Sequence, residues 1–283
     1  MVKIIADSTC DLSPELISKY DIEIIPLHIV LDDKEYEDGK TITPDEIYEW
    51  ADANKTTPKT SAAGIEQVIE VLRPYVEKGD DIIVLTISAS MSTTNNVMRL
   101  AAAELEAEGQ VYVVDSANLS TGGGLLVLEA CDMVAEGKSA AEIVERLEEL
   151  KPLVRASFVV DTLTYLHRGG RCSGVAALAG GVLKLHPIIV VESGAMKPAE
   201  KLRGKMSKVI LDYAKSMEED LKKAQNKRVF ITHSGCDQEI LDNVQQYLSE
   251  LGKFQEIIIT RAGGVISSHC GPGTLGVLFI AGE

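Results

Sequence analysis

The chain has 283 residues, of which 45% are hydrophobic and 25% are charged, and its formal net charge is −15 with a pI near 4.8. A strongly acidic chain repels the phosphates of nucleic acids and of anionic lipid headgroups, so we expect no nucleic acid partner and no docking on anionic lipid. No stretch approaches the roughly 20 apolar residues of a membrane span and no signal peptide is evident, so we expect a cytoplasmic protein without integral membrane association.

Apolar runs of strand length alternate with helical patterns along the chain. The predicted strands are residues 2–6, 22–31, 81–87, 110–115, 156–161, 186–192, 228–233, 256–260 and 275–280. Most of them lack polar alternation, which is typical of sheets covered on both faces. The pattern therefore predicts an α/β fold with right-handed crossovers between parallel strands.

Helix-start signals separate several of these strands. The clearest are Ser13-Pro14, Thr43-Pro44 with Glu46, and Ser139 with Glu142. An N-cap hydroxyl followed by proline, or by glutamate three residues later, is typical of a helix N-terminus. Helices are also predicted over 64–76, 95–108 and the apolar stretch 175–185.

The length of the chain is near the size at which one domain usually becomes two. A charged helical stretch ends at Lys151-Pro152, and the next apolar run begins at residue 156. We therefore expect two α/β domains, residues 1–155 and 156–283.

Polar loops rich in glycine or hydroxyl groups interrupt the apolar pattern. They are residues 7–11, 59–64, 88–96, 168–174 and 268–276, and the last brings His269 and Thr274 together with Gly271. Ligands of open α/β sheets bind beyond the carboxyl ends of strands, where helix N-termini offer free amides. The loops therefore predict an anion site, although Thr60 and Ser61 would equally well cap the helix that follows them.

Other chemistries receive less support from the residues. The five cysteines form no CxxC pair and no Cys-His-Asn signature, and a reducing cytosol explains an odd set better than disulfides do. His233 and Cys236 lack zinc-ligand spacing, and no GxxxxGK[ST] phosphate loop occurs. Asp7 and Asp115 end strands, where accepting loop amides is a commoner role than catalysis.

A set of motifs spans essentially the whole chain: ADSTCDL (6–12), KTS (59–61), ISASMS (87–92), VDS (114–116), DTLTYLHRGGR (161–171) and HCGPGTLG (269–276). Together they resemble the DegV family of bacterial fatty-acid-binding proteins. The resemblance implies two α/β lobes, an N-terminal one with a mainly parallel sheet and a C-terminal one with a mixed sheet. A long-chain fatty acid such as palmitate or oleate is expected between them, with no cofactor.

The resemblance also implies roles for individual residues. Thr60 and Ser92 are expected to hydrogen-bond the carboxylate, with His269 close by and Arg171 near the head group or an incoming phosphoryl group. Ser61, Gly271 and Thr274 complete the expected ligand-binding set. The family implies that the protein is not itself an enzyme but presents the carboxylate to a separate ATP-dependent fatty acid kinase, which forms the acyl phosphate.

The small-residue stretch 175–185 and the aromatic content of 5% are compatible with a narrow channel for an alkyl tail, although close helix packing explains the small residues as well. A tail of roughly 14 methylenes would contribute about 11 kcal/mol at ~0.8 kcal/mol each. Two alternatives stay open. One is a phosphoryl or acyl transferase that acts alone through the same loops, and the other is a regulatory module that holds a small metabolite.

Overall fold

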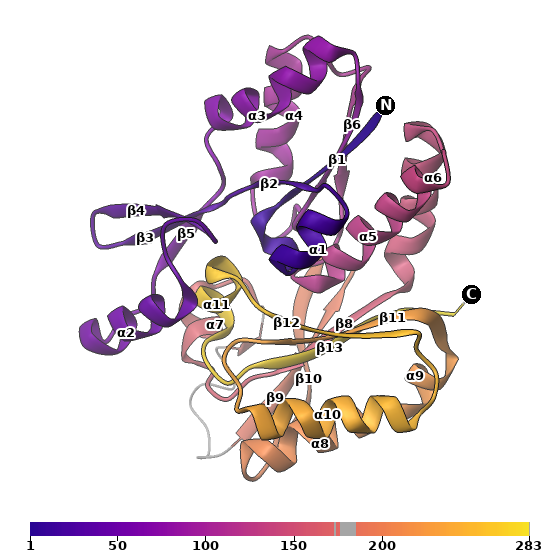
Figure 1. Ribbon diagram of the computed structural model, residues 1–283. Coiled ribbons are helices and arrows are strands. Elements are labelled where there is room, and N and C mark those ends of the chain that lie inside the picture. The colour runs from indigo at the N-terminus through magenta and orange to yellow at the C-terminus, as the bar shows by residue number, and fades with distance from the viewer. Residues whose placement is uncertain (173, 176–184, 283) are drawn as a thin grey trace.

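The computed structural model describes residues 1–172, 174–175 and 185–282 and contains three β-sheets (Figure 1). The N-terminal half holds a four-stranded sheet of order β2-β1-β6-β7, built from Glu23–Ile25, Val2–Asp7, Asp81–Thr86 and Val111–Asp115. Every neighbouring pair in it is parallel. The predicted parallel α/β lobe is therefore confirmed.

A second, three-stranded sheet projects from the first together with helix α2 (Pro44–Asn54). Its order is β4-β3-β5, formed by Lys34–Glu37, His28–Leu31 and Lys59–Ser61, and both pairs are antiparallel. The prediction of one strand over 22–31 is thus wrong, because the chain leaves the parallel sheet at Pro26 and enters another sheet at His28. The prediction of a loop at 59–64 is also wrong for its first three residues, which form β5.

The C-terminal half holds a six-stranded mixed sheet, as predicted. Its order is β10-β9-β8-β13-β11-β12, formed by Ala195–Arg203, Leu185–Glu192, Val154–Val159, Leu275–Ala281, Ala224–His233 and Glu256–Arg261. Only β11 and β12 pair in parallel, and the other neighbours are antiparallel. Strand β10 lies at one edge of this sheet, and most of its residues are exposed or half-buried. Its sequence is therefore largely polar, and the pattern of apolar runs did not predict it.

The helices form layers on both sheets. Helices α3 (Ile65–Lys78) and α4 (Thr94–Glu104) cover one face of the parallel sheet, and α5 (Thr121–Ala135) and α6 (Ala140–Leu150) cover the other. Helices α8 (Met206–Ser216), α9 (Glu218–Lys223) and α10 (Gln238–Glu250) cover the outer face of the mixed sheet (Figure 1). The other α-helices in the described ranges are α1 (Pro14–Lys19), α7 (Thr164–Gly169) and α11 (Gly264–Cys270).

One buried apolar cluster joins the two halves. It includes Ile4 and Leu85 of the parallel sheet, Leu126 of α5, and Phe230 and Leu278 of the mixed sheet. Helix α5 therefore packs between the two sheets and contributes to both. The chain passes from the parallel sheet and its helices into the mixed sheet at β8, which begins at Val154. The domain boundary at residue 155 remains a prediction.

The predicted helix starts are confirmed by their capping bonds. Both Thr43 and Ser139 form a capping box with the glutamate three residues later, and the Ser13 hydroxyl accepts a hydrogen bond from the Leu16 amide at 3.4 Å. The capping alternative for Thr60 and Ser61 is wrong, because the N-cap of α3 is Gly64 and no side chain caps it. These two hydroxyl groups are therefore available for another role.

Two further expectations need correction or comment. The stretch 268–276 is not a continuous loop, because its first three residues form the last turn of α11 and its last two begin β13. Of the helix expected over 175–185, residues 176–184 lie outside the described residues, and Leu185 belongs to β9. Among the helices in the described ranges, none is long and apolar enough to span a bilayer.

Candidate functional site

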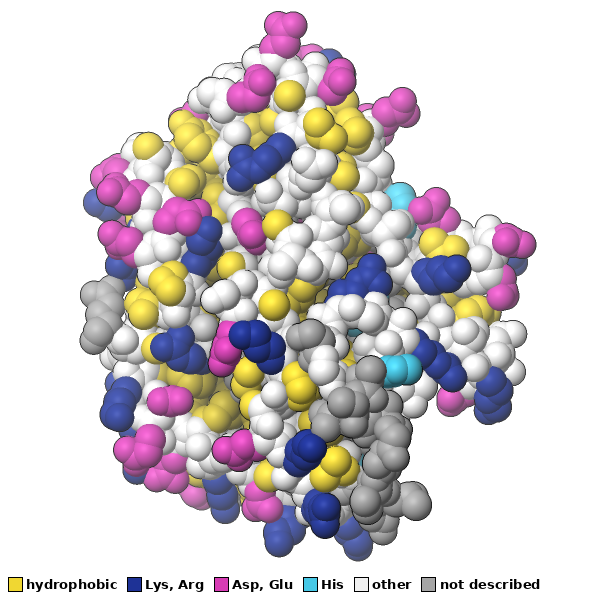
Figure 2. Space-filling view, turned by 180° about the vertical axis from the view of Figure 1, so that it is seen from behind, with side chains coloured by type: hydrophobic (Ala, Val, Ile, Leu, Met, Phe, Trp, Pro, Cys, Tyr) yellow, Lys and Arg dark blue, Asp and Glu magenta, His cyan; other side chains and the backbone are white. Residues whose placement is uncertain are grey.

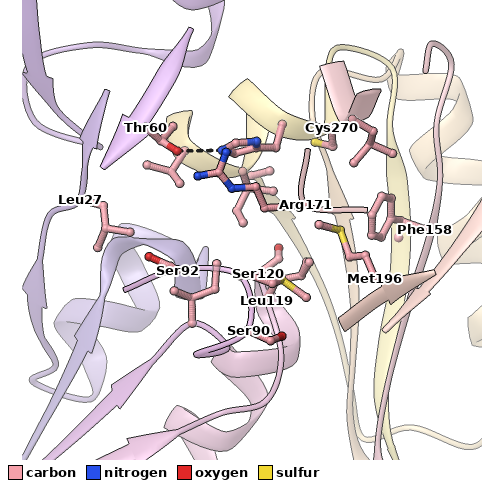
Figure 3. A pocket seen from close by; sticks show the side chains of 18 of the residues that line it. Leu27, Thr60, Ser90, Ser92, Leu119, Ser120, Phe158, Arg171, Met196 and Cys270 are labelled. Atoms are coloured by element: carbon pink, nitrogen blue, oxygen red, sulfur yellow. Dashed lines mark hydrogen bonds between the residues drawn. The ribbon is translucent and has the colours of Figure 1, made fainter. Parts of the chain in front are cut away.

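A cavity of about 790 Å³ lies between the N-terminal and C-terminal halves (Figure 3). Much of its wall is apolar and is contributed by Leu27, Ile87, Leu119, Phe158, Met196 and Leu278. Leu27 and Ser92 reach it from the N-terminal half, while Phe158 and Met196 reach it from strands of the mixed sheet (Figure 3). The volume and the largely apolar wall suit an elongated apolar ligand.

Thr60 and His269 meet at this cavity although 209 positions separate them in the sequence. The Thr60 hydroxyl, on β5, lies 2.8 Å from Nε2 of the His269 ring, in the last turn of α11 (Figure 3). Nδ1 of the same ring is buried and has no hydrogen-bond partner among the described residues. The imidazole therefore retains hydrogen-bonding capacity that no described residue uses.

Burial, and next the positive charge of Arg171, lower the pKa of His269 to about 4. The ring is therefore neutral at physiological pH, with one nitrogen a donor and the other an acceptor. A neutral imidazole beside a hydroxyl group offers hydrogen bonds to an acidic head group, while the permanent charge at this end of the cavity comes from arginine.

Ser92 lines the same cavity, in the turn that precedes α4. Its hydroxyl oxygen lies 2.8 Å from the Thr94 hydroxyl and accepts a hydrogen bond from the Thr94 amide at 3.3 Å. The Asp7 carboxylate holds the start of this turn, because it accepts a hydrogen bond from the Ile87 amide at 2.7 Å. Asp115 similarly accepts from the amides of Ala89 and Ala117, so the predicted role of both aspartates as acceptors of loop amides is confirmed.

The same turn also contacts the C-terminal half. Ser88 donates a hydrogen bond to the Gly194 carbonyl at 2.7 Å, and Ser90 donates to the same oxygen. Gly194 and Ser193 form the tip of the β9–β10 hairpin and both have positive φ, which suits the tight turn of a two-residue hairpin. Two hydroxyl groups of the segment 88–96, those of Ser88 and Ser90, therefore join the two halves beside the cavity. A third, that of Ser92, belongs to the cavity wall.

Arg171 follows α7, is exposed, and lines the cavity on the same side as Thr60 (Figure 3). Its Nη1 donates a hydrogen bond to the Gly169 carbonyl at 2.6 Å, which holds the guanidinium group next to the end of α7. On the face shown in Figure 2, basic side chains lie on and beside the part that projects from the main body, together with acidic ones.

The remaining predicted site residues divide into two groups. Ser61 and Thr274 line the cavity, and the Thr274 hydroxyl donates to the Cys270 carbonyl at 3.0 Å. Gly271 is not among the lining residues. It has a φ of +77°, and a Cβ there would lie 2.6 Å from the Tyr165 ring, so this glycine permits close packing of α7 against the turn after α11.

Sequence reasoning missed several wall residues. Leu27 was assigned to the middle of a longer strand, Met196 lies on the unrecognised edge strand β10, and Arg99 lies on α4. Pro26 was the one local signal that the strand ended before Leu27. The others carry no signal in isolation, because their role depends on which distant segment faces them.

The cysteines provide no nucleophile. None of the five forms a disulfide, and burial raises the pKa of each, to about 11 for Cys172 and to about 12 for Cys270. The helix that follows Cys10 thus does not lower the pKa of that thiol, because burial dominates. Within the described ranges, no group of three or more His, Cys, Asp or Glu side chains could hold a metal ion.

A profile of the DegV family, described as uncharacterised, matches residues 1–282. The chain belongs to the DegV family. A fatty acid-binding protein of Thermotoga maritima is 34% identical over 97% of this chain and 96% of its own length. A fatty-acid-binding DegV protein from Thermus thermophilus is similar in structure, with a TM-score of 0.91 and 31% identity over 99% of both chains.

A stearic acid-binding protein from Eubacterium ventriosum is also similar, with a TM-score of 0.87 and 29% identity over 99% of this chain and 98% of that one. The α/β fold with a parallel and a mixed sheet is thus that of the DegV structures. These DegV relatives carry names for fatty acid binding rather than for an enzymatic activity or a cofactor.

Proposed function

We propose that this protein binds one long-chain fatty acid, such as palmitate or oleate, in the cavity between its two halves. The observation that carries the proposal is the pairing of a largely apolar wall with the Thr60–His269 pair at one end of the same cavity. In the proposed complex, the hydroxyl groups of Thr60 and Ser92 donate to the carboxylate, and His269 lies beside it. The names of the Thermotoga, Thermus and Eubacterium relatives support this ligand class.

The chemistry of the wall explains why a fatty acid is preferred over a small polar metabolite. A carboxylate removed from water needs hydrogen-bond donors, which the hydroxyl groups and Arg171 supply. A tail of roughly 14 methylenes gains about 11 kcal/mol on burial, less the cost of immobilisation. Tail burial therefore sets most of the affinity, and the head-group contacts set the orientation of the ligand.

We further propose that the bound carboxylate is presented to a separate fatty acid kinase, with Arg171 supporting the negative charge during phosphoryl transfer. The exposure of Arg171 beside the head-group end supports this division of labour. An arginine suits either oxyanion, because its planar fork donates to carboxylate and phosphate alike. The protein itself then needs no catalytic residue.

Native mass spectrometry of protein purified from a bacterial host tests fatty acid binding directly. We expect a mass increment that disappears on denaturation and corresponds to one acyl chain. Isothermal titration of delipidated protein with palmitate and oleate should then give binding with a stoichiometry of one. An empty cavity in the purified protein, together with no measurable heat of binding, would contradict the proposal.

Arg171→Ala tests the presentation step. We expect it to lower acyl phosphate formation with ATP and the kinase more strongly than it lowers fatty acid affinity. Lys197→Ala is a matched control, because it removes an exposed cation that pairs with Glu192 on the β9–β10 hairpin. Equal losses of binding and phosphorylation in Arg171→Ala would argue against the proposed role, and acyl phosphate formation without any kinase would favour the stand-alone transferase.

A further inference from the structure

Two buried carboxylates from the N-terminal half hold the start of helix α11, which comes from the C-terminal half. Oδ1 of Asp11 accepts a hydrogen bond from the Gly263 amide at 2.8 Å, and Oδ1 of Asp38 accepts one from the Gly264 amide at 2.7 Å. The partners are 252 and 226 positions apart in the sequence. These bonds use amide groups that a helix N-terminus otherwise leaves free.

The second oxygen of each carboxylate is also bonded, so neither side chain is free to rotate. Oδ2 of Asp11 accepts from the Ser120 hydroxyl at 2.5 Å, and Oδ2 of Asp38 accepts from the Ser8 hydroxyl at 2.8 Å. Only 5% of Asp11 and 2% of Asp38 is exposed. Each carboxylate is thus a rigid bridge between a loop of the N-terminal half and the first turn of α11.

The glycines at this junction allow the close approach. A Cβ on Gly263 would lie 3.2 Å from Oδ1 of Asp11, and a Cβ on Gly264 would lie 2.6 Å from Cδ1 of Ile29. A larger residue at 264 would meet Ile29 of the three-stranded sheet, so either the helix or this side chain would have to shift. The contact therefore sets both the distance and the direction of α11 relative to β3 and its neighbour β5.

Helix α11 carries several residues of the cavity wall, among them Val265, Ile266 and His269. It has only seven residues, so a displacement at its start moves the whole helix. The Thr60–His269 hydrogen bond, at 2.8 Å, would be lost after a shift of roughly 1 Å. We infer that Asp11 and Asp38 are positioning residues that keep His269 within hydrogen-bond reach of Thr60 and of the ligand head group.

The energetic cost of these groups supports a role beyond stability. Burial raises the pKa of both carboxyl groups, and repulsion between the two adds to the effect for Asp11. Buried carboxylates are expensive even when hydrogen-bonded, and they stabilise a fold weakly compared with apolar residues of similar size. Their role here is to fix geometry, because the two hydrogen-bond acceptors hold the amides of Gly263 and Gly264 at the start of α11.

The ring of His269 reports on this geometry even without a ligand. We would follow the pKa of His269 by NMR titration in wild type and in Asp38→Ala, with the signal assigned from its loss in His269→Gln. In Asp38→Ala we expect the pKa to rise from about 4 toward its ordinary 6.5, because the freed helix lets water reach the ring. Asp38→Asn retains an oxygen acceptor for the Gly264 amide and should leave the pKa near its wild-type value.

Fatty acid affinity is the second readout, and the expected effect on it rests on the proposed function. Asp38→Ala should weaken binding by about 10- to 100-fold, as for loss of a hydrogen bond to a charged group, while Asp38→Asn stays within about 3-fold. Asp132→Ala is the control for general destabilisation, because Asp132 binds Arg228 at 2.6 Å and does not hold α11. It should change neither the His269 pKa nor the affinity.

A folded Asp38→Ala variant with the wild-type His269 pKa would overturn the inference, whether or not fatty acid binds. If wild type itself binds no fatty acid, the proposed function fails but the NMR comparison still decides the role of Asp38. Should Asp38→Ala not fold, Asp11→Ala replaces it, because this change removes the acceptor of the Gly263 amide at the same helix start. A rise in the His269 pKa is expected there too, and an unchanged pKa would refute the inference.

Discussion

Replacement of Thr60 by valine tests the head-group end of the cavity most directly. Valine has nearly the same shape as threonine and favours strands equally, so β5 and its pairing with β3 should persist. The change removes the one hydroxyl that lies 2.8 Å from Nε2 of His269, whose Nδ1 already has no partner in the described part of the chain. Without a ligand, neither ring nitrogen would then have a hydrogen-bond partner among the described residues.

Two magnitudes follow from this change. An unsatisfied buried group costs about 1–3 kcal/mol, so the free energy of unfolding should fall by that amount. A lost hydrogen bond to a carboxylate costs about 1.5–3 kcal/mol, so the Kd for palmitate should rise roughly 10- to 100-fold. Urea unfolding measures the first quantity and isothermal titration calorimetry the second.

Thr93→Val is the matched control, because Thr93 also lines the cavity but makes no capping bond with α4. Its affinity should stay within about 2-fold of wild type, less than the loss of one weak hydrogen bond. Equal affinities of Thr60→Val and wild type for palmitate would refute the assignment of the carboxylate to this end of the cavity.

The remaining predictions concern pH, the tail and the turn after α11. The pKa of His269 is about 4 in the folded chain, below its ordinary 6.5 in the unfolded chain. Between pH 6.5 and pH 4, the unfolded chain therefore binds a proton at His269 that the folded chain does not. His269 should therefore reduce stability by up to ~3 kcal/mol between pH 6.5 and 4, and urea unfolding of His269→Gln should show a correspondingly smaller acid loss. Met196→Trp narrows the cavity, so the ratio of palmitate to decanoate affinity should fall, and an unchanged ratio would mean that the tail lies elsewhere. Gly271→Ala should lower the free energy of unfolding by more than about 1 kcal/mol, because the φ of +77° and the Tyr165 ring both oppose a Cβ, whereas Gly137→Ala meets no neighbouring atom and should lose less.

The sequence predicted the parts of the fold that follow from local pattern. The continuous apolar runs of β1, β6 and β7 predicted a covered parallel sheet, and the N-cap signals located α2 and α6. The three-stranded sheet escaped prediction, because β5 is short and polar and β3 merges with β2 in one apolar run. An edge strand such as β10 exposes most of its side chains, so apolar content does not reveal it.

The candidate site was predictable only through motifs. No local pattern relates Thr60 to His269, and the bond between them depends on how α11 docks against the three-stranded sheet. The same holds for Met196 and Phe158, which become neighbours of the cavity through the pairing of distant strands. Spacing rules describe one helix or one strand, whereas this site is assembled from both halves of the chain.

The shared apolar cluster around α5 has a consequence for how a ligand would enter and leave. Because α5 packs against both sheets, a hinge that swung the two halves apart would expose Leu126, Phe230 and Leu278 to water. At about 1.5–3 kcal/mol for each such side chain, exposing these three would cost about 4.5–9 kcal/mol, so a clamshell motion is disfavoured. Ligand exchange that moved only the turns beside the cavity would leave this cluster buried.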